Sequence, residues 1–146
     1  KQQSKPLAFL YMDIDHFKRV NDTYGHNVGD DILKGFAARM KDGLRSFDLI
    51  ARLGGEEFVA ILPDTPAETA YMIAERLRKM IETKPFSVNN DTQELNVTCS
   101  FGGVTLSGDH TQSLTVPELI QKADEQLYKA KHDGRNCVYF ADKGRL

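Results

Sequence analysis

Residues 51–62 read ARLGGEEFVAIL, with apolar β-type runs on either side of a glycine pair. Gly54-Gly55 predicts a two-residue hairpin turn between two strands. Two adjacent acids, Glu56 and Glu57, follow the glycines directly. Because neighbouring strand residues face opposite sides of a sheet, both acids cannot point into solvent when one face is packed. The hairpin therefore raises the question of what two carboxylates do at its mouth.

The hydrophobic pattern of the remaining chain predicts strands and helices that do not alternate strictly. Residues 28–43 carry one apolar stripe at spacings of one, three and four, as an amphipathic helix does. Residues 65–68 and 115–118 match the capping box that begins a helix, each with a proline in its first turn. Residues 84–94 predict an exposed loop or a small hairpin. The pattern indicates an α+β fold, with helices packed on one mostly antiparallel sheet. We expect strands over 7–12, 48–53, 57–62, 95–99, 101–106 and 136–140, and helices over 16–22, 28–43, 66–83 and 116–132.

The composition is that of an ordinary globular domain, with 146 residues, 40% hydrophobic and 27% charged. A net charge of −2 disfavours a nucleic-acid polymer as partner, because domains that bind such polymers usually carry a basic surface. The longest apolar stretches fall short of the roughly 20 residues that span a bilayer. Cys99 and Cys137 have no metal-ligand spacing and predict two reduced core thiols. We expect a cytoplasmic domain that is not inserted in a membrane.

Two further acids end the first predicted strand. Asp13 and Asp15 share a face if the strand persists, although Asp15 could instead cap the next helix while Asp13 ends in solvent. If the strand over 57–62 lies beside the first strand, three or four carboxylates meet in one small volume. Such a cluster repels itself unless a cation or protons neutralise it. Oxygen ligands without histidine or cysteine suit Mg²⁺ or Mn²⁺, whose remaining ligands are usually water and substrate phosphates, which indicates a polyphosphate substrate.

The sequence contains no familiar phosphate-binding loop, since neither GxxxxGK[ST] nor a GxGxxG after a strand occurs. Lys131 and Arg135 could clamp phosphates, or could simply complement a helix C-terminus that Gly134 ends. Asn21 and Asp30 could recognise a purine edge, or could serve turns and caps. Both interpretations stay open at this point.

Taken together, the motifs closely resemble the GGDEF family, the diguanylate cyclase domains of bacteria, in its GGEEF variant, which is associated with active enzymes. The resemblance runs in order from about residue 7 to residue 140. It implies a single GGDEF domain over residues 1–146 and a nucleotidyl cyclase fold, which is a ferredoxin-like palm with a five-stranded sheet. The matching segments are Asp13–Lys18, Asn21-Asp22, Gly25-His26, Gly29-Asp30, Arg52–Phe58, Ala123-Asp124, Leu127-Tyr128, Ala130-Lys131 and Gly134–Asn136.

The resemblance implies that two GTP molecules are condensed into cyclic di-GMP with release of two pyrophosphates, at the interface of a homodimer. It also implies two Mg²⁺ or Mn²⁺ ions per active site. Glu56 is our choice of proton acceptor, with Glu57 beside it. The implied metal ligands are Asp13, the Ile14 carbonyl, Glu56 and Glu57; the implied GTP contacts are the amides near Phe17 and Lys18, then Asn21, His26, Asp30, Lys131 and Arg135.

A second family feature is the RxxD motif formed by Arg45 and Asp48, five residues ahead of Gly54. In this family that spacing marks an inhibitory site for the product, where Arg45 would hold a phosphate and a guanine face and Asp48 a guanine edge. Taken alone, RxxD indicates no more than a surface ion pair.

The family usually carries a DxLTGLxNRR-type segment and a helix before the first strand, whereas this chain begins six residues before it. We expect that this helix is trimmed and that the parent protein carries an upstream regulatory domain. If the parent protein is anchored in a membrane, we expect this domain on the cytoplasmic side. An inactive domain that serves as a receptor for cyclic di-GMP or GTP is the alternative function. A pure scaffold would need no acidic metal site. The intact Asp13, Glu56, Glu57 and Lys131 favour the enzyme.

Overall fold

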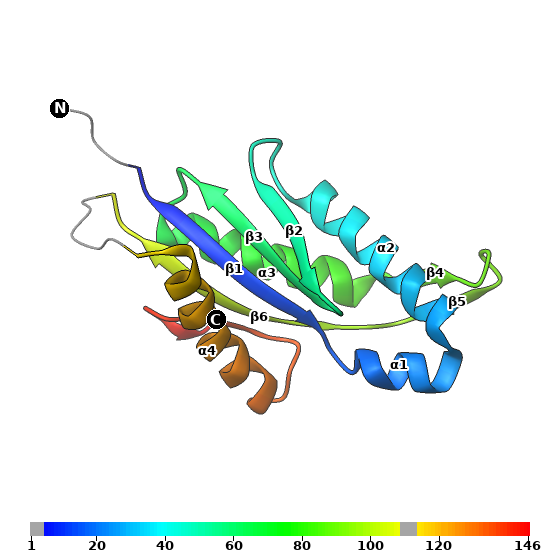
Figure 1. Ribbon diagram of the computed structural model, residues 1–146. Helices are drawn as coiled ribbons and strands as arrows, with labels where there is room; N and C mark the ends of the chain where they lie inside the picture. Colours follow the sequence, from blue (N-terminus) through cyan, green and yellow to red (C-terminus); the bar gives the residue numbers. More distant parts are fainter. Residues whose placement is uncertain (1–4, 109–113) are drawn as a thin grey trace.

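The computed structural model describes residues 5–108 and 114–146. Strands and helices follow each other in an α+β order, which confirms the predicted fold class (Figure 1). The elements are β1 (Leu7–Ile14), α1 (Phe17–Tyr24), α2 (His26–Gly43), β2 (Leu49–Gly54), β3 (Glu57–Pro63), α3 (Ala67–Thr83), β4 (Phe86–Val88), β5 (Gln93–Leu95), β6 (Cys99–Leu106), α4 (Val116–His132), β7 (Val138–Phe140) and β8 (Gly144–Arg145).

The main sheet has the strand order β2-β3-β1-β6-β7-β8. β1 lies at its centre and pairs antiparallel with both β3 and β6, while β7 joins β6 in parallel. The sheet therefore has six strands where five were expected, because the two-residue β8 adds a final edge. A separate two-stranded sheet pairs β4 with β5, which confirms the small hairpin expected over 84–94.

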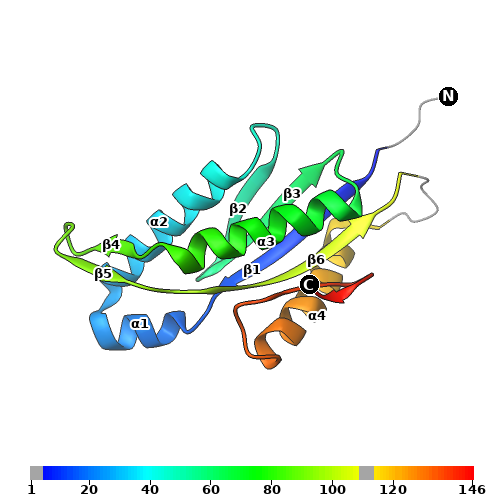
Figure 2. The ribbon, with the colours of Figure 1, turned by 180° about the vertical axis from the view of Figure 1, so that it is seen from behind.

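Helices cover both faces of the sheet. α4 packs on one face, and α3 crosses the other together with α2 (Figures 1 and 2). Alternate side chains of β1 enter the two cores: Leu10 and Met12 contact the α2/α3 side, whereas Phe9 and Tyr11 contact the α4 side. A strand buried on both faces reads as a continuous apolar run, and this explains the sequence of β1.

Contact between α4 and the sheet is close at Gly102 in β6. A β-carbon at this position would lie 2.2 Å from the Ala123 carbonyl oxygen and 2.3 Å from the Leu127 backbone nitrogen. Since both atoms belong to the α4 backbone, only glycine lets the helix approach this far. The described residues contain no helix that is both long and apolar enough to cross a membrane.

Three local predictions are wrong. The turn of the β2–β3 hairpin consists of Gly55 and Glu56, because Gly54 pairs with Glu57 across a register shift. The strands expected over 95–99 and 101–106 are instead the short β5 and one continuous β6 that begins at Cys99.

The third wrong prediction concerns the capping box at Thr65. α3 begins at Ala67 without a side-chain cap, and the buried Thr65 hydroxyl instead donates to the Pro63 carbonyl (2.8 Å) and accepts from Arg45. The capping box at Thr115 is confirmed, with Glu118 donating to the threonine hydroxyl (3.3 Å) and accepting from its amide (2.9 Å).

Candidate active site

The hairpin tip and the end of β1 lie side by side. Asp13 is in register with Glu57, and the Ile14 amide donates to the Glu56 carbonyl oxygen at 3.3 Å. This pairing follows from the antiparallel register of β1 and β3, which brings the carboxyl end of one strand to the beginning of the other. The two acidic segments that the sequence singled out are therefore neighbours.

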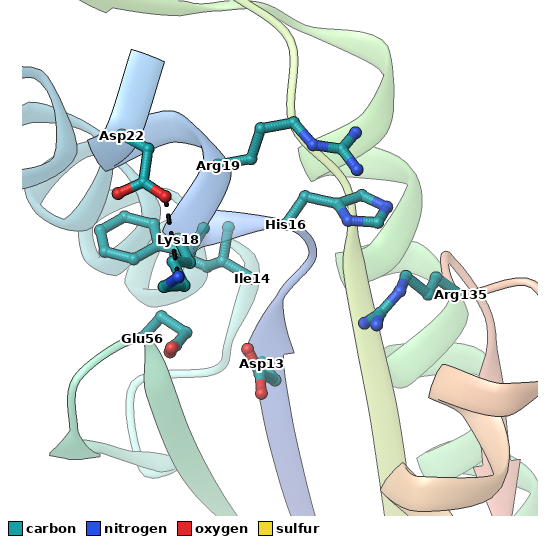
Figure 3. Close-up of a pocket in the computed structure, with 9 residues that line it drawn as sticks. Asp13, Ile14, His16, Lys18, Arg19, Asp22, Glu56 and Arg135 are labelled. Atoms are coloured by element: carbon teal, nitrogen blue, oxygen red, sulfur yellow. Dashed lines mark ion pairs between the residues drawn. The ribbon is translucent and has the colours of Figure 1, made fainter. Parts of the chain in front are cut away.

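A hollow of about 490 Å³ opens where these segments meet α1 and the turn after α4. Its volume falls within the roughly 300–1,000 Å³ of small-molecule sites. Figure 3 shows Asp13 and Glu56 at one end, with Lys18 entering from α1 and Arg135 from the opposite side. The hollow thus combines carboxylates with cationic groups, which suits a polyphosphate together with a cation. Its lining consists of Asp13, Ile14, His16, Phe17, Lys18, Arg19, Asp22, Glu56 and Arg135.

Asp13 is the least solvated acid of the hollow. Its side chain is 10% exposed and forms an ion pair with Lys131 of α4. Burial raises the pKa of Asp13 to about 6; Lys131 opposes this rise, while the nearby charges of Glu56 and Glu57 add to it. The alternative in which Asp13 ends its strand in solvent is therefore wrong. Lys131 thus compensates only part of the cost of burying the Asp13 charge beside Glu56 and Glu57.

Glu57 lies outside the lining of the hollow. Its carboxylate accepts a hydrogen bond from the Tyr11 hydroxyl at 2.9 Å, and burial together with Glu57 raises the pKa of Tyr11 far above its ordinary value. Among residues 5–108 and 114–146, no group of three or more His, Cys, Asp or Glu is arranged to hold a metal. Three acids line the hollow, but Asp22 forms an ion pair with Lys18 at 3.8 Å, so of the three or four clustered carboxylates expected only Asp13 and Glu56 lie together here. This pair still fits Mg²⁺, which is usually held by one or two carboxylates, water and substrate phosphates.

The residues expected to recognise guanine lie on α1 and α2, outside the lining of this hollow. Asn21 Oδ1 is buried and has no hydrogen-bond partner among the described residues. Gly29 of α2 allows this close approach, since a β-carbon there would lie 1.9 Å from that oxygen. His26 begins α2, and Asp30 is exposed one turn later. A buried acceptor without a partner is an exception in folded proteins, and a hydrogen-bond donor of a ligand is one group that would satisfy it.

The comparison with known proteins decides the family. The description "Diguanylate cyclase, GGDEF domain" matches residues 1–137. The chain belongs to the GGDEF family. The GGDEF fold also accounts for the mixed sheet and its flanking helices.

Relatives of this GGDEF domain include a response regulator and a named diguanylate cyclase. The chain is 45% identical over 133 residues to the response regulator PleD of Caulobacter vibrioides, covering 91% of this chain and 29% of PleD. It is 40% identical over 137 residues to diguanylate cyclase A of Treponema denticola, covering 94% of this chain and 36% of that protein. The chain thus spans about a third of the length of each of these two curated relatives. The GGDEF domain of DgcB from Caulobacter crescentus in complex with c-di-GMP has a TM-score of 0.84 at 29% identity, covering 94% of this chain and 79% of that one.

The RxxD motif of this GGDEF domain forms a closed pair in the loop between α2 and β2. The Arg45 guanidinium donates to both carboxylate oxygens of Asp48, each at 2.9 Å, and lies over the Phe47 ring at 4.6 Å. The Asp48 side chain is fully buried, whereas that of Arg45 is 29% exposed. Arg45 and Asp48 therefore do form an ion pair, but the pair is partly buried and not on the surface, and it joins the two ends of the loop.

Sequence reasoning named Lys131 and Arg135 as phosphate contacts, and in the structure Lys131 pairs with Asp13 while Arg135 lines the hollow. It missed Arg19, which lines the hollow one helical position after Lys18, and Tyr11, the partner of Glu57. Neither residue carries a motif signal. Arg19 reads as a surface position of α1, and Tyr11 as one more apolar residue of β1.

Proposed function

We propose that this GGDEF domain condenses two GTP molecules into cyclic di-GMP and releases two pyrophosphates. The observation that carries the proposal is the hollow in which the carboxylates of Asp13 and Glu56 face the cationic side chains of Lys18 and Arg135. In a GGDEF domain, this combination suits a triphosphate and the cations that accompany it. The names of the curated relatives support the same reaction.

Each domain would hold one GTP, and two copies would meet face to face as a homodimer. The 3′-hydroxyl oxygen of each GTP attacks the α-phosphorus of the other, and the bond from that phosphorus to the pyrophosphate leaving group breaks. Glu56 accepts the proton of the attacking hydroxyl. Because the exchange is symmetric, two P–O bonds form, two break, and two pyrophosphates leave. One domain alone therefore contains half of the machinery.

Asp13, Glu56 and the Ile14 carbonyl would hold Mg²⁺ or Mn²⁺, two ions per site, with Glu57 as a further ligand once it exchanges its contact with Tyr11. When bound, the ions offset phosphate charge and lower the pKa of the attacking hydroxyl. The amides near Phe17 and Lys18, with Lys131 and Arg135, would receive the β- and γ-phosphates.

Guanine recognition would fall to Asn21 and Asp30, with His26 against the nucleotide. The unpaired Asn21 Oδ1 supports this role, since guanine N1–H and N2–H are hydrogen-bond donors and an amide oxygen accepts from such groups. The exposed Asp30 carboxylate would accept from the same edge. The domain works in the cytoplasm, where GTP is available, downstream of a regulatory domain in the parent protein.

Product inhibition would act through Arg45 and Asp48. What supports this is the bidentate fork of Arg45 beside the Phe47 ring, which offers a guanidinium and an aromatic face to a planar base and a phosphate. Because the two residues already bond each other, cyclic di-GMP must share or replace that ion pair.

The reaction is tested with Glu56→Gln, which keeps size and hydrogen-bonding capacity but removes the charge. We expect cyclic di-GMP formation from GTP and Mg²⁺ to fall roughly 100-fold or more, measured by chromatography of the products. The matched control is Glu94→Gln, the same change at an exposed position of β5, which should keep full activity. An equally active Glu56→Gln protein would refute the mechanism, and tight GTP binding without turnover by the unmodified dimer would support the receptor instead.

The inhibitory site is tested with Arg45→Lys. This change keeps a cation for the buried Asp48 but removes the planar fork. We expect half-maximal inhibition to require about tenfold more added cyclic di-GMP, which corresponds to the loss of about one charge-assisted bond. An unchanged inhibition curve in a variant with an unchanged melting temperature would remove the inhibitory-site assignment.

A further inference from the structure

The second aspartate of the first strand's motif is buried and bonded at the meeting point of three segments. The Asp15 side chain is 1% exposed. Its carboxylate accepts hydrogen bonds from the hydroxyls of Thr98 (2.7 Å) and Ser100 (2.6 Å) and from the Asn136 amide (3.0 Å). It does not cap α1, whose N-cap is His16 without a side-chain bond. Asp15 therefore joins the end of β1 and the beginning of β6 to the turn after α4.

That turn has an unusual backbone. Gly134, Arg135 and Asn136 have φ angles of 92°, 62° and 47°, so three consecutive residues lie in the left-handed region. Glycine adopts this conformation freely and asparagine tolerates it, but arginine does so at a cost. Such a conformation persists only where the surroundings hold it in place.

Three sets of contacts hold the turn. The Arg135 amide donates to the Ala130 carbonyl oxygen of α4 at 3.0 Å. Asp15 binds the Asn136 amide from one side. From the other side, α3 binds the Asn136 side chain, with Arg78 donating to its oxygen at 2.9 Å and Glu82 accepting from its nitrogen at 2.8 Å. The turn is thus fixed both through its backbone and through its side chain.

The result of this arrangement is the position of Arg135. Its side chain is 37% exposed and lines the hollow that contains Asp13 (Figure 3). Its Nη1 lies 4.0 Å from Asp15 Oδ1. With right-handed backbone angles at this position, the side chain would leave the turn in another direction. Asp15 itself does not line this hollow.

We propose that Asp15 is a positioning residue that holds the turn after α4 so that Arg135 presents its guanidinium to the distal phosphates of the nucleotide. The ligand in this statement rests on the proposed function; the mechanical link between Asp15 and Arg135 does not. Asp15 acts entirely through Arg135 and makes no contact with the nucleotide.

A double-mutant cycle separates this role from general support of the fold. Asp15→Asn, Arg135→Ala and the double variant are titrated with GTP and with GMP, which lacks the distal phosphates. We expect each single change to weaken GTP binding about tenfold and GMP binding less than about twofold. The double variant should bind GTP no more weakly than Arg135→Ala alone, because both changes remove the same contact.

Because Asp15→Asn could disturb folding, a second pair of variants tests the other end of the arrangement. Asn136→Ala and Asn136→Gly lose the same side chain, but only glycine retains easy access to the left-handed region. We expect Asn136→Ala to weaken GTP binding at least about threefold more than Asn136→Gly. Amide hydrogen exchange of residue 136 supplies a readout without nucleotide, since protection should fall in Asp15→Asn.

Each outcome decides a separate point. If the losses of GTP affinity in the two single variants add up in the double variant, or if GTP and GMP lose affinity equally, the positioning role would be overturned and general destabilisation indicated. Unchanged protection of the Asn136 amide in Asp15→Asn would overturn the mechanical link. Failure of the unmodified chain to bind GTP would overturn the proposed function and the ligand named here, while the exchange measurement would still decide the link between Asp15 and the turn.

Discussion

Replacement of Lys131 by methionine removes the cation that compensates Asp13 and keeps most of the aliphatic stem. The two side chains are 27% and 10% exposed, so their ion pair lies between a surface pair and a buried one. Surface pairs contribute about 0–1 kcal/mol, whereas loss of one partner of a buried pair costs about 3–5 kcal/mol. We therefore expect Lys131→Met to lower the free energy of unfolding by about 2 kcal/mol. For a domain of this size, that corresponds to a melting temperature about 4–8 °C lower.

The loss of stability in Lys131→Met should grow as the pH rises. Burial raises the pKa of Asp13 to about 6 even with Lys131 present, so the folded state binds this proton more tightly than the unfolded chain. Stability from such a group is present at low pH and is lost as pH rises through the folded pKa. Without Lys131 that pKa rises further. The deficit of Lys131→Met should therefore be small at pH 5 and largest at pH 8.

The assay is urea unfolding at pH 5, 7 and 8 in the absence of divalent cations. The control is Lys129→Met, which removes an exposed lysine from the same last turn of α4 and so matches the loss of helix-dipole interaction. Adding Asp13→Asn to Lys131→Met should restore part of the lost stability, since it removes the uncompensated charge. Equal stabilities of the two lysine variants, or a deficit that shrinks toward pH 8, would refute the reasoning.

Two further predictions concern the core around the site. Gly102→Ala would place a β-carbon 2.2 Å from the α4 backbone, so we expect the free energy of unfolding to fall by about 3 kcal/mol or more. GTP binding should weaken as α4 shifts. Thermal melting and GTP titration measure the two effects, and a melting temperature within about a degree of the unmodified chain would contradict the first. Burial raises the pKa of both the Cys99 and Cys137 thiols, so neither should react with Ellman's reagent in the native domain and both should react in guanidinium chloride; rapid reaction of either thiol in the native domain would show that its segment opens.

Several features of the fold could be predicted because their physical cause is local. The apolar stripe of α2 and the capping box at Thr115 depend on residues within a few positions of each other. The placement of Asp13 beside the hairpin followed from one assumption about strand pairing, which the register of β1 and β3 confirms.

The predictions that failed depend on distant partners. The strands expected over 95–99 and 101–106 leave Ser100 between them, but its buried hydroxyl donates to Asp15 and β6 continues through it. Thr65 carries a capping sequence, yet its hydroxyl is taken by Pro63 and by Arg45, which is 20 residues away. Polar side chains with a choice of partners are thus the points where a single sequence gives the least information.

The burial of Asp15 could not be predicted either, because it too depends on partners that are distant in the sequence. Its partners Ser100 and Asn136 lie 85 and 121 residues along the chain, and no periodicity connects them. In the sequence it reads equally well as a helix cap. Only the packing of β6 and the turn after α4 against the end of β1 reveals its position.

The central claim is that two copies of this domain make cyclic di-GMP from GTP, and the most direct test is the initial rate at increasing protein concentration with Mg²⁺ present. Because each copy would carry half of the machinery, the rate per protein should rise in proportion to protein concentration until dimers saturate. Glu56→Gln should lower this rate roughly 100-fold or more. No cyclic di-GMP at any concentration, even in a covalently tethered dimer, would contradict the account, and a rate per protein independent of concentration in a monomer would contradict the two-copy mechanism.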